Sequence, residues 1–84
     1  MNHKASLRFW NCYNALPADI RALADAAFML LKSDARHPSL HLKRVGDKWS
    51  VRIGLHYRAL AVESHGNMVW FWIGPHAEYD RMIH

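Results

Sequence analysis

The chain has 84 residues, which predicts a single domain over residues 1–84 because a second hydrophobic core would bury too little surface. The composition, 51% hydrophobic and 21% charged, is typical of a globular protein and excludes a disordered one. The first residues are polar and no long apolar run follows them, so we predict no signal peptide, no membrane span and no membrane partner. The single cysteine, Cys12, has no partner for an internal disulfide, and we expect a cytoplasmic protein.

Two helices are predicted in the first part of the chain. Ser6 is a suitable N-cap for a short helix over Leu7–Ala15. Pro17 suits the first turn of a second helix that extends to Ser33. Apolar residues recur in that helix at helical spacing, at Ile20, Leu23, Ala24, Ala27, Phe28 and Leu31. We expect the two helices to pack antiparallel to each other.

After Ser39 the hydrophobic period changes to two residues, which is typical of β-strands. Four strands are predicted, over Leu40–Val45, Lys48–Ile53, Tyr57–Glu63 and Met68–Ile73. The short turns between them predict an antiparallel meander, which a short N-terminal strand would complete. His76–Ile83 would add a closing helical turn. The predicted fold class is therefore α+β, an N-terminal helical hairpin packed on one face of a twisted antiparallel sheet.

Positive charge gathers in the middle of the chain. Between Ala35 and Val62 the basic residues outnumber the single acidic residue, Asp47, by five, compared with a net charge of +4 for the whole chain. The basic residues are Arg36, Lys43, Arg44, Lys48, Arg52 and Arg58. This clustering favours a polyanionic partner, either nucleic acid or an acidic protein segment, over an ordinary solvated face.

Side chains that suit RNA chemistry follow the predicted strands. Arg52, Arg58, His76 and Tyr79 come from neighbouring elements of the sheet. Arginine binds phosphate through two hydrogen bonds, histidine transfers protons near neutral pH, and tyrosine stacks on a base. Arg58 also shares a strand face with apolar residues. Burying its charge there is costly unless the guanidinium reaches a hydrated cleft, binds an anion or extends to solvent at the edge of the sheet. The alternative, in which His76 and Tyr79 only cap and pack the C-terminal turn, remains open.

A metal site is not expected, although the chain has seven histidines. His37 and His41 are four residues apart, but Pro38 prevents the regular helix that would align them. Cys12 has no second cysteine and no HExxH motif occurs, so we predict neither metal nor cofactor. The four tryptophans are expected mostly in the core, with one on the outer face available to anchor a protein partner.

Several stretches of the sequence resemble the RelE/ParE superfamily of bacterial type II toxins, in particular small RelE/HigB-like members. They are Leu16-Pro17, HPSLHLK at 37–43, SVRI at 50–53, YRA at 57–59 and WFWIGPHAEYD at 70–80. The similarity spans nearly the whole chain. It implies a toxin neutralised by a cognate antitoxin, which inhibits translation by metal-independent, ribosome-dependent cleavage of mRNA.

The resemblance also assigns roles to individual residues. Arg58 matches the arginine of the family's YR strand, His76 matches the Arg or His after the last strand, and Tyr79 approximates the C-terminal tyrosine. Together with Arg52 they form the expected catalytic set: Arg58 would stabilise the phosphorane, His76 would transfer protons, and Tyr79 would orient or stack on a base. The expected RNA-binding residues are Lys43, Arg44, Arg36 and His56.

Two observations keep other functions open. The superfamily also contains gyrase poisons that lack the ribonuclease residues, so a ParE-like gyrase-directed toxin or a non-catalytic antitoxin-binding module is the alternative. Glu78 and Asp80 flank the predicted site, where they either pair with Arg81 or Arg52 or weaken RNA binding.

Overall fold

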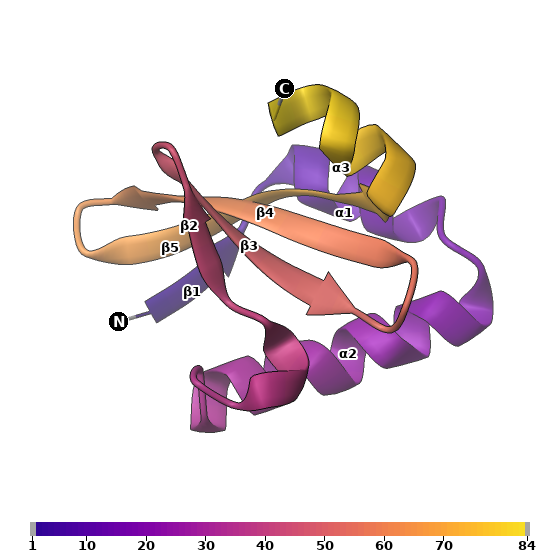
Figure 1. Cartoon of the computed structure of the whole chain (residues 1–84), viewed down its shortest axis with the longest axis horizontal. Coiled ribbons are helices and arrows are strands. Elements are labelled where there is room, and N and C mark those ends of the chain that lie inside the picture. Colours follow the sequence, from indigo (N-terminus) through magenta and orange to yellow (C-terminus); the bar gives the residue numbers. More distant parts are fainter. Residues whose placement is uncertain (1, 84) are drawn as a thin grey trace.

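The computed structural model describes residues 2–83, which begin with a short strand and two helices (Figure 1). These are β1 (Asn2–Ala5), α1 (Leu7–Asn14) and α2 (Ala18–Ser33). Ser6 caps α1 as predicted, because its Oγ accepts a hydrogen bond of 3.2 Å from the backbone N–H of Phe9. Pro17 is the residue before α2, where its fixed φ prepares the first helical turn.

The remainder of the chain alternates short strands with tight turns and ends in a third helix. The elements are η1 (Pro38–Leu40), β2 (Lys43–Val45), β3 (Lys48–Ile53), β4 (Tyr57–Ser64), β5 (Asn67–Pro75) and α3 (His76–Ile83). The first predicted strand of this half is shorter than expected. It begins at Lys43 because Pro38–Leu40 form a turn of 3₁₀ helix, and His41 then takes a left-handed conformation with a φ of 43°.

The strands form one mixed sheet in the order β1-β5-β4-β3-β2. The antiparallel meander of β2 to β5 is as predicted, and the expected N-terminal strand is also present. β1 pairs with β5 in the parallel direction. Short turns predict antiparallel pairing only between strands that are consecutive in the chain, so they do not predict the direction of β1. The α+β fold class is confirmed. None of the helices described within residues 2–83 is long and apolar enough to cross a membrane.

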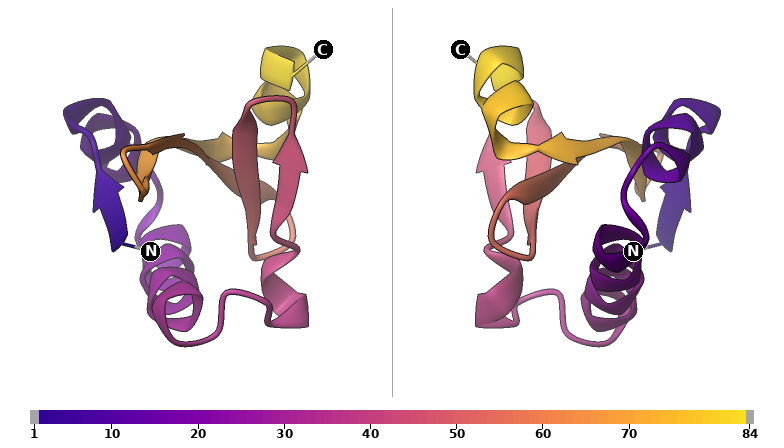
Figure 2. Two further views of the ribbon diagram at one scale, coloured as in Figure 1. Left: turned by 90° about the vertical axis from the view of Figure 1, so that its left-hand side faces the viewer. Right: turned by 90° about the vertical axis from the view of Figure 1, so that its right-hand side faces the viewer.

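Helices cover the two faces of the twisted sheet unequally (Figure 2). α1 and α2 pack on one face around a large core that includes Phe9, Ile53 and Trp70. α3 packs on the other face over a small cluster, in which Leu60 and Trp72 lie beneath Tyr79. The predicted antiparallel helical pair is held by an edge-to-face contact between Phe9 and Phe28, with ring centroids 5.4 Å apart.

A β-bulge separates the two tryptophans of β5. Leu60 pairs with Trp72 but the next residue, Ala61, pairs with Trp70, so one residue of β5 is left over between them. In a regular strand residues 70 and 72 would lie on the same face. The bulge instead directs Trp70 into the core under α2 and Trp72 under α3. This is how the last strand can be apolar on both faces.

Candidate functional site

Two arginines lie opposite each other on the face of the sheet that α3 covers. Arg52 of β3 pairs in antiparallel register with Arg58 of β4, so both side chains leave the same face with Cβ atoms about 4.5–5.5 Å apart. Like charges in this position repel each other. Among residues 2–83, no carboxylate lies within 4.0 Å of either guanidinium. The pair is therefore suited to bind an anion, for which two forked donors give a specific geometry.

Arg58 is held in place by few polar contacts. Its Nη1 donates a hydrogen bond of 3.0 Å to the Oγ of Ser50, which is fully buried. Its guanidinium carbon lies 5.1 Å from the ring centroid of Tyr79. The residue is only 6% exposed, and its Nε is buried without a hydrogen-bond partner in the part of the chain described. A buried charge with an unused donor is costly, which leaves Arg58 with binding capacity for an anionic ligand.

A histidine and a carboxylate form a pair at the start of α3. The backbone N–H of His76 donates to the carbonyl oxygen of His56 over 2.7 Å, which fixes the first residue of the helix against the β3–β4 turn. The Nδ1 of His76 lies 3.1 Å from the Oδ2 of Asp80, one helical turn later. When Nδ1–H donates to the carboxylate, Nε2 carries the lone pair of the neutral ring and can accept a proton. Asp80 thus pairs with His76, and not with Arg81 or Arg52.

A cleft of about 210 Å³ connects these groups. Arg52, Arg58 and His76 line it, as the sequence predicts, and so do three residues that the sequence analysis did not identify: His41, Leu55 and Tyr57. Arg58 therefore borders a cleft from within the sheet. The contact between His76 and Asp80 could have been predicted from the sequence, because residues four apart on a helix are neighbours. No such spacing predicts the place of His41, because it lies outside any regular element.

Tyr79 and Lys43 complete this face of the sheet. Tyr79 is 1% exposed, and its hydroxyl has no hydrogen-bond partner within residues 2–83. Its burial with Leu60 and Trp72 leaves no free ring face for a base in this arrangement, and agrees with a packing role. Lys43 shares the face through its pairing with Ser50, and its Nζ lies 6.0 Å from the Tyr79 ring centroid.

None of the four predicted RNA-binding residues lines the cleft, and of the four only Lys43 shares a sheet face with Arg52 and Arg58. Arg44 points to the opposite face, where its guanidinium carbon lies 5.8 Å from the ring centroid of Trp49. Arg36 is exposed in the loop between α2 and η1. His56 is exposed in the β3–β4 turn and contributes its backbone carbonyl to His76. Adjacent strand residues point to opposite faces, so Lys43 and Arg44 cannot both serve one site on the sheet.

Gly74 of β5 is tightly packed against a tryptophan. Gly74 pairs with Arg58, and a Cβ built on Gly74 would lie 2.5 Å from the indole of Trp72. No side chain can be accommodated there unless Trp72 moves. The absence of a Cβ at residue 74 therefore leaves room for the indole of Trp72.

A helical pair on one face of such a sheet, with basic strand residues and a C-terminal helix on the other, defines the RelE/ParE class of toxin folds. The resemblance seen in the sequence is confirmed. The chain belongs to the ParE-like toxin domain family, whose sequence model matches residues 18–81. No curated protein sequence matches the chain.

Solved structures of several toxins share this fold. A chain of the RelB-RelE antitoxin-toxin complex from Methanococcus jannaschii is similar with a TM-score of 0.74 at 10% identity, over 96% of this chain and 99% of that one. The YoeB/ParE toxin from Agrobacterium tumefaciens gives a TM-score of 0.67 at 15% identity, over 90% and 99% of the two chains. The isolated E. coli RelE toxin gives 0.65 at 12% identity, over 99% and 98%.

Proposed function

We propose that this protein is the toxin of a type II toxin–antitoxin system and that it inhibits translation by cleaving mRNA on the ribosome. Membership of the ParE-like toxin domain family supports the toxin role. The observation that carries the ribonuclease activity is the Arg52–Arg58 pair, which faces a cleft shared with the His76–Asp80 pair. Phosphate-binding donors and a proton acceptor around one cleft are the groups that cleavage of RNA through its 2′-hydroxyl requires.

In the proposed reaction, the protein supplies both charge stabilisation and proton transfer, without a metal. Arg52 and Arg58 bind the non-bridging oxygens of the scissile phosphate, and Arg58 stabilises the extra charge of the phosphorane. His76, oriented by Asp80, accepts the proton of the 2′-hydroxyl through Nε2. The 2′ oxygen then bonds to phosphorus and the 5′ oxygen leaves, which produces a 2′,3′-cyclic phosphate.

The remaining basic residues would act on the surrounding RNA. Lys43 lies on the same face as Arg52 and would hold a phosphate next to the scissile one. Arg44, Arg36 and His56 lie outside the cleft, so in this proposal they contact RNA or ribosome beyond the cleaved nucleotides. Tyr79 would orient Arg58 through its ring, and would meet a base only if α3 moved.

A translation extract with radiolabelled mRNA tests the ribonuclease activity. We expect the purified protein to produce new mRNA ends when ribosomes are translating, and to leave the same mRNA uncut when ribosomes are omitted. Products should end in a cyclic phosphate, which acid treatment opens. Intact mRNA together with inhibited DNA supercoiling by gyrase would contradict the proposal and support a gyrase-directed toxin.

One observation favours the non-catalytic alternative. Arg58 and Tyr79 are almost fully buried beneath α3, as expected for side chains whose role is to hold the helix in place. A module that binds only its antitoxin would need no more than this. In that case the extract would show neither cleaved mRNA nor inhibited supercoiling, while the protein would still bind its antitoxin.

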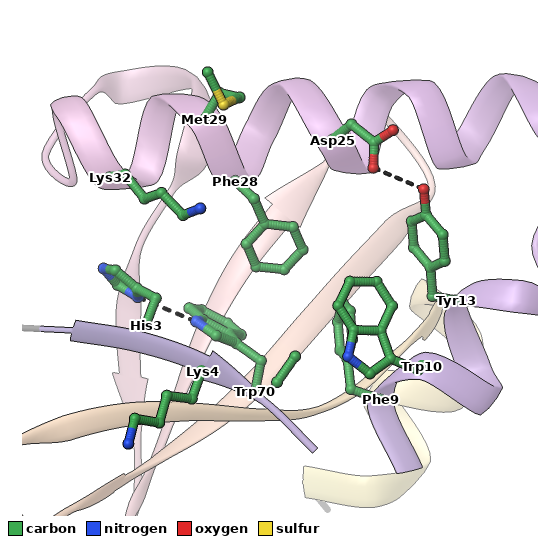
Figure 3. A pocket seen from close by; sticks show the side chains of 11 residues that line it. His3, Lys4, Phe9, Trp10, Tyr13, Asp25, Phe28, Met29, Lys32 and Trp70 are labelled. Carbon is green, nitrogen blue, oxygen red and sulfur yellow. Dashed lines mark hydrogen bonds between the residues drawn. The ribbon is translucent and has the colours of Figure 1, made fainter. Parts of the chain in front are cut away.

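The proposed antitoxin presents an acidic, partly apolar segment that lies across the basic strands and masks Arg52 and Arg58. The RelB-RelE antitoxin-toxin complex among the similar structures supports an antitoxin as the partner. Apolar side chains of the antitoxin would dock on the helical pair, where a cavity of about 340 Å³ opens between β1, α1 and α2 (Figure 3). Trp10 and Met29 line this cavity and are 47% and 70% exposed, so Trp10 is the outward-facing tryptophan expected from the sequence.

The walls of this cavity are held by specific polar contacts (Figure 3). The Tyr13 hydroxyl donates a hydrogen bond of 2.7 Å to Asp25, which links α1 to α2. Burial lowers the pKa of His3, which favours the neutral ring, and Nδ1 accepts a hydrogen bond of 3.2 Å from Nε1 of Trp70. The aromatic surface is therefore preorganised for an apolar ligand.

Association with the antitoxin is expected to depend on salt. The association rate constant of the toxin and its antitoxin should fall about tenfold or more when ionic strength rises from about 0.05 M to 0.5 M. Salt screens the attraction between the basic face and an acidic segment, which otherwise acts over several ångströms. Stopped-flow fluorescence of the exposed Trp10 would follow this rate. Arg52→Ala should flatten the salt dependence. A rate that does not change with ionic strength would contradict the masking of the basic strands.

A further inference from the structure

His41 combines an unfavourable backbone conformation with a position on the cleft. Its φ of 43° and ψ of 48° lie in the left-handed region, where glycine is the residue without steric cost. The conformation ends the turn of η1, since the His41 N–H donates to the carbonyl oxygen of Pro38 over 3.2 Å. A glycine would make the same backbone hydrogen bond without strain, so the backbone alone does not explain a histidine here. Strained residues of this kind gather at functional sites.

The side chain of His41 borders the cleft of Arg52, Arg58 and His76. His41 precedes the start of β2 and His76 follows the end of β5, and the strand register puts both of these points at the same end of the sheet. Two histidines thus line one cleft of about 210 Å³, with the arginine pair bordering the same space. Of these two histidines, only His76 has a carboxylate within 4.0 Å among the described residues, and that carboxylate belongs to Asp80.

We propose that His41 is the second proton-transfer residue of this site and that it protonates the leaving 5′ oxygen during RNA cleavage. This inference rests on the proposed ribonuclease function. It follows from the difference between the two rings: His76 is oriented by Asp80 to accept a proton, whereas His41 has no carboxylate within 4.0 Å among residues 2–83 to hold its ring in one orientation. Cleavage through the 2′-hydroxyl needs both an acceptor and a donor of protons.

Protons and electrons balance when the two histidines act together. Nε2 of His76 takes the proton of the 2′-hydroxyl, and the 2′ oxygen forms its bond to phosphorus. The bond between phosphorus and the 5′ oxygen breaks, its electron pair stays on that oxygen, and protonated His41 supplies the proton. His76 ends protonated and His41 neutral, and bulk water restores both. The charged and titratable groups that line the cleft with His41 are Arg52, Arg58, Tyr57 and His76, and the Nδ1 of His76 is paired with Asp80.

The first test is the pH dependence of single-turnover cleavage on ribosomes. Wild-type protein is expected to give a bell-shaped profile, in which the alkaline fall reports loss of the proton from the acid. His41→Gln should lower the maximal rate about 10²–10⁴-fold and remove the alkaline fall. His65→Gln is the matched control, because His65 is also exposed and has a positive φ of 51°, but lies in the β4–β5 turn away from the cleft. It should keep both the rate and the profile of the wild type.

A substrate with sulfur in place of the bridging 5′ oxygen gives the sharper test. A thiolate leaves without protonation, so this substrate should restore the His41→Gln rate to within about tenfold of wild type and should not restore His76→Gln. His41→Gly should keep or raise the melting temperature while losing cleavage, since glycine relieves the left-handed strain. If wild-type protein cleaves mRNA and His41→Gln cleaves at the same rate with the same profile, His41 is not the acid. If the wild-type protein cuts no RNA at all, the proposed function itself fails and this inference with it.

Discussion

Arg58→Ala is expected to lower the single-turnover rate of mRNA cleavage by about 10²–10³-fold, with little change in ribosome affinity. Arg58 lines the cleft, and its buried Nε has no hydrogen-bond partner within residues 2–83. A donor placed in this way stabilises charge that develops on the phosphate only in the transition state. Measuring the rate at saturating protein, together with a binding titration, separates the two effects.

Two further variants exclude simpler explanations of that result. Arg44→Ala removes the same charge from the opposite face of the sheet and should leave the cleavage rate nearly unchanged. Arg58→Lys keeps the charge but loses the planar fork and the contact with Ser50, so its rate should lie between those of Arg58→Ala and wild type. Thermal unfolding of each variant checks the fold, because Arg58 is only 6% exposed. Full activity of a folded Arg58→Ala protein would remove the central residue of the ribonuclease proposal.

Tyr79→Ala is expected to lower the free energy of unfolding by about 3–5 kcal/mol, a large part of the stability of a small domain. Tyr79 is 1% exposed and packs α3 onto Leu60 and Trp72. Its removal would leave a cavity under the helix and would take the aromatic ring away from Arg58. Urea denaturation followed by tryptophan fluorescence would measure the change, since Trp72 lies in the same cluster.

Tyr79→Phe is the matched variant, and it should have the opposite effect. The Tyr79 hydroxyl is buried without a partner within residues 2–83, so its removal should leave the free energy of unfolding unchanged or raise it by about 1 kcal/mol. Cleavage should be retained if the ring alone positions Arg58. A loss of stability similar to that of Tyr79→Ala would show that the hydroxyl has a bonding role in the folded protein. A selective loss of cleavage would instead assign the hydroxyl to the reaction.

Much of the fold was predictable because the signals for it are local. The helical spacing of apolar residues and the Ser6 cap predicted α1 and α2 to within a residue or two. The two-residue period predicted the bounds of Lys48–Ile53 correctly. Alternation within this strand puts Val51 and Ile53 on one face and Arg52 on the other, and the structure has them so. Each of these inferences needs only neighbouring residues, since the geometry of a single helix or strand determines its periodicity.

The candidate site was predictable in residue type and only partly in arrangement. Arg52, Arg58 and His76 were identified by their chemistry and by resemblance, and the structure brings all three to one cleft. Lys43 and Arg44 were both predicted to bind RNA, but adjacent residues of a strand lie on opposite faces of the sheet, so the two cannot act at one site there. The exposure of Tyr79 could not be judged either, because it depends on the surface against which α3 packs.

The sequence by itself determined the helices, most of the strand bounds and, in a strand without a bulge, which residues share a face. Only the tertiary structure decided that Arg52 lies opposite Arg58, because strand register depends on pairing between segments and not on either segment alone. The same holds for the bulge that separates Trp70 from Trp72 and for the parallel pairing of β1 with β5. His41 is the extreme case, because a residue in a left-handed turn follows no period. Its place on the cleft depends on where η1, the sheet and α3 meet.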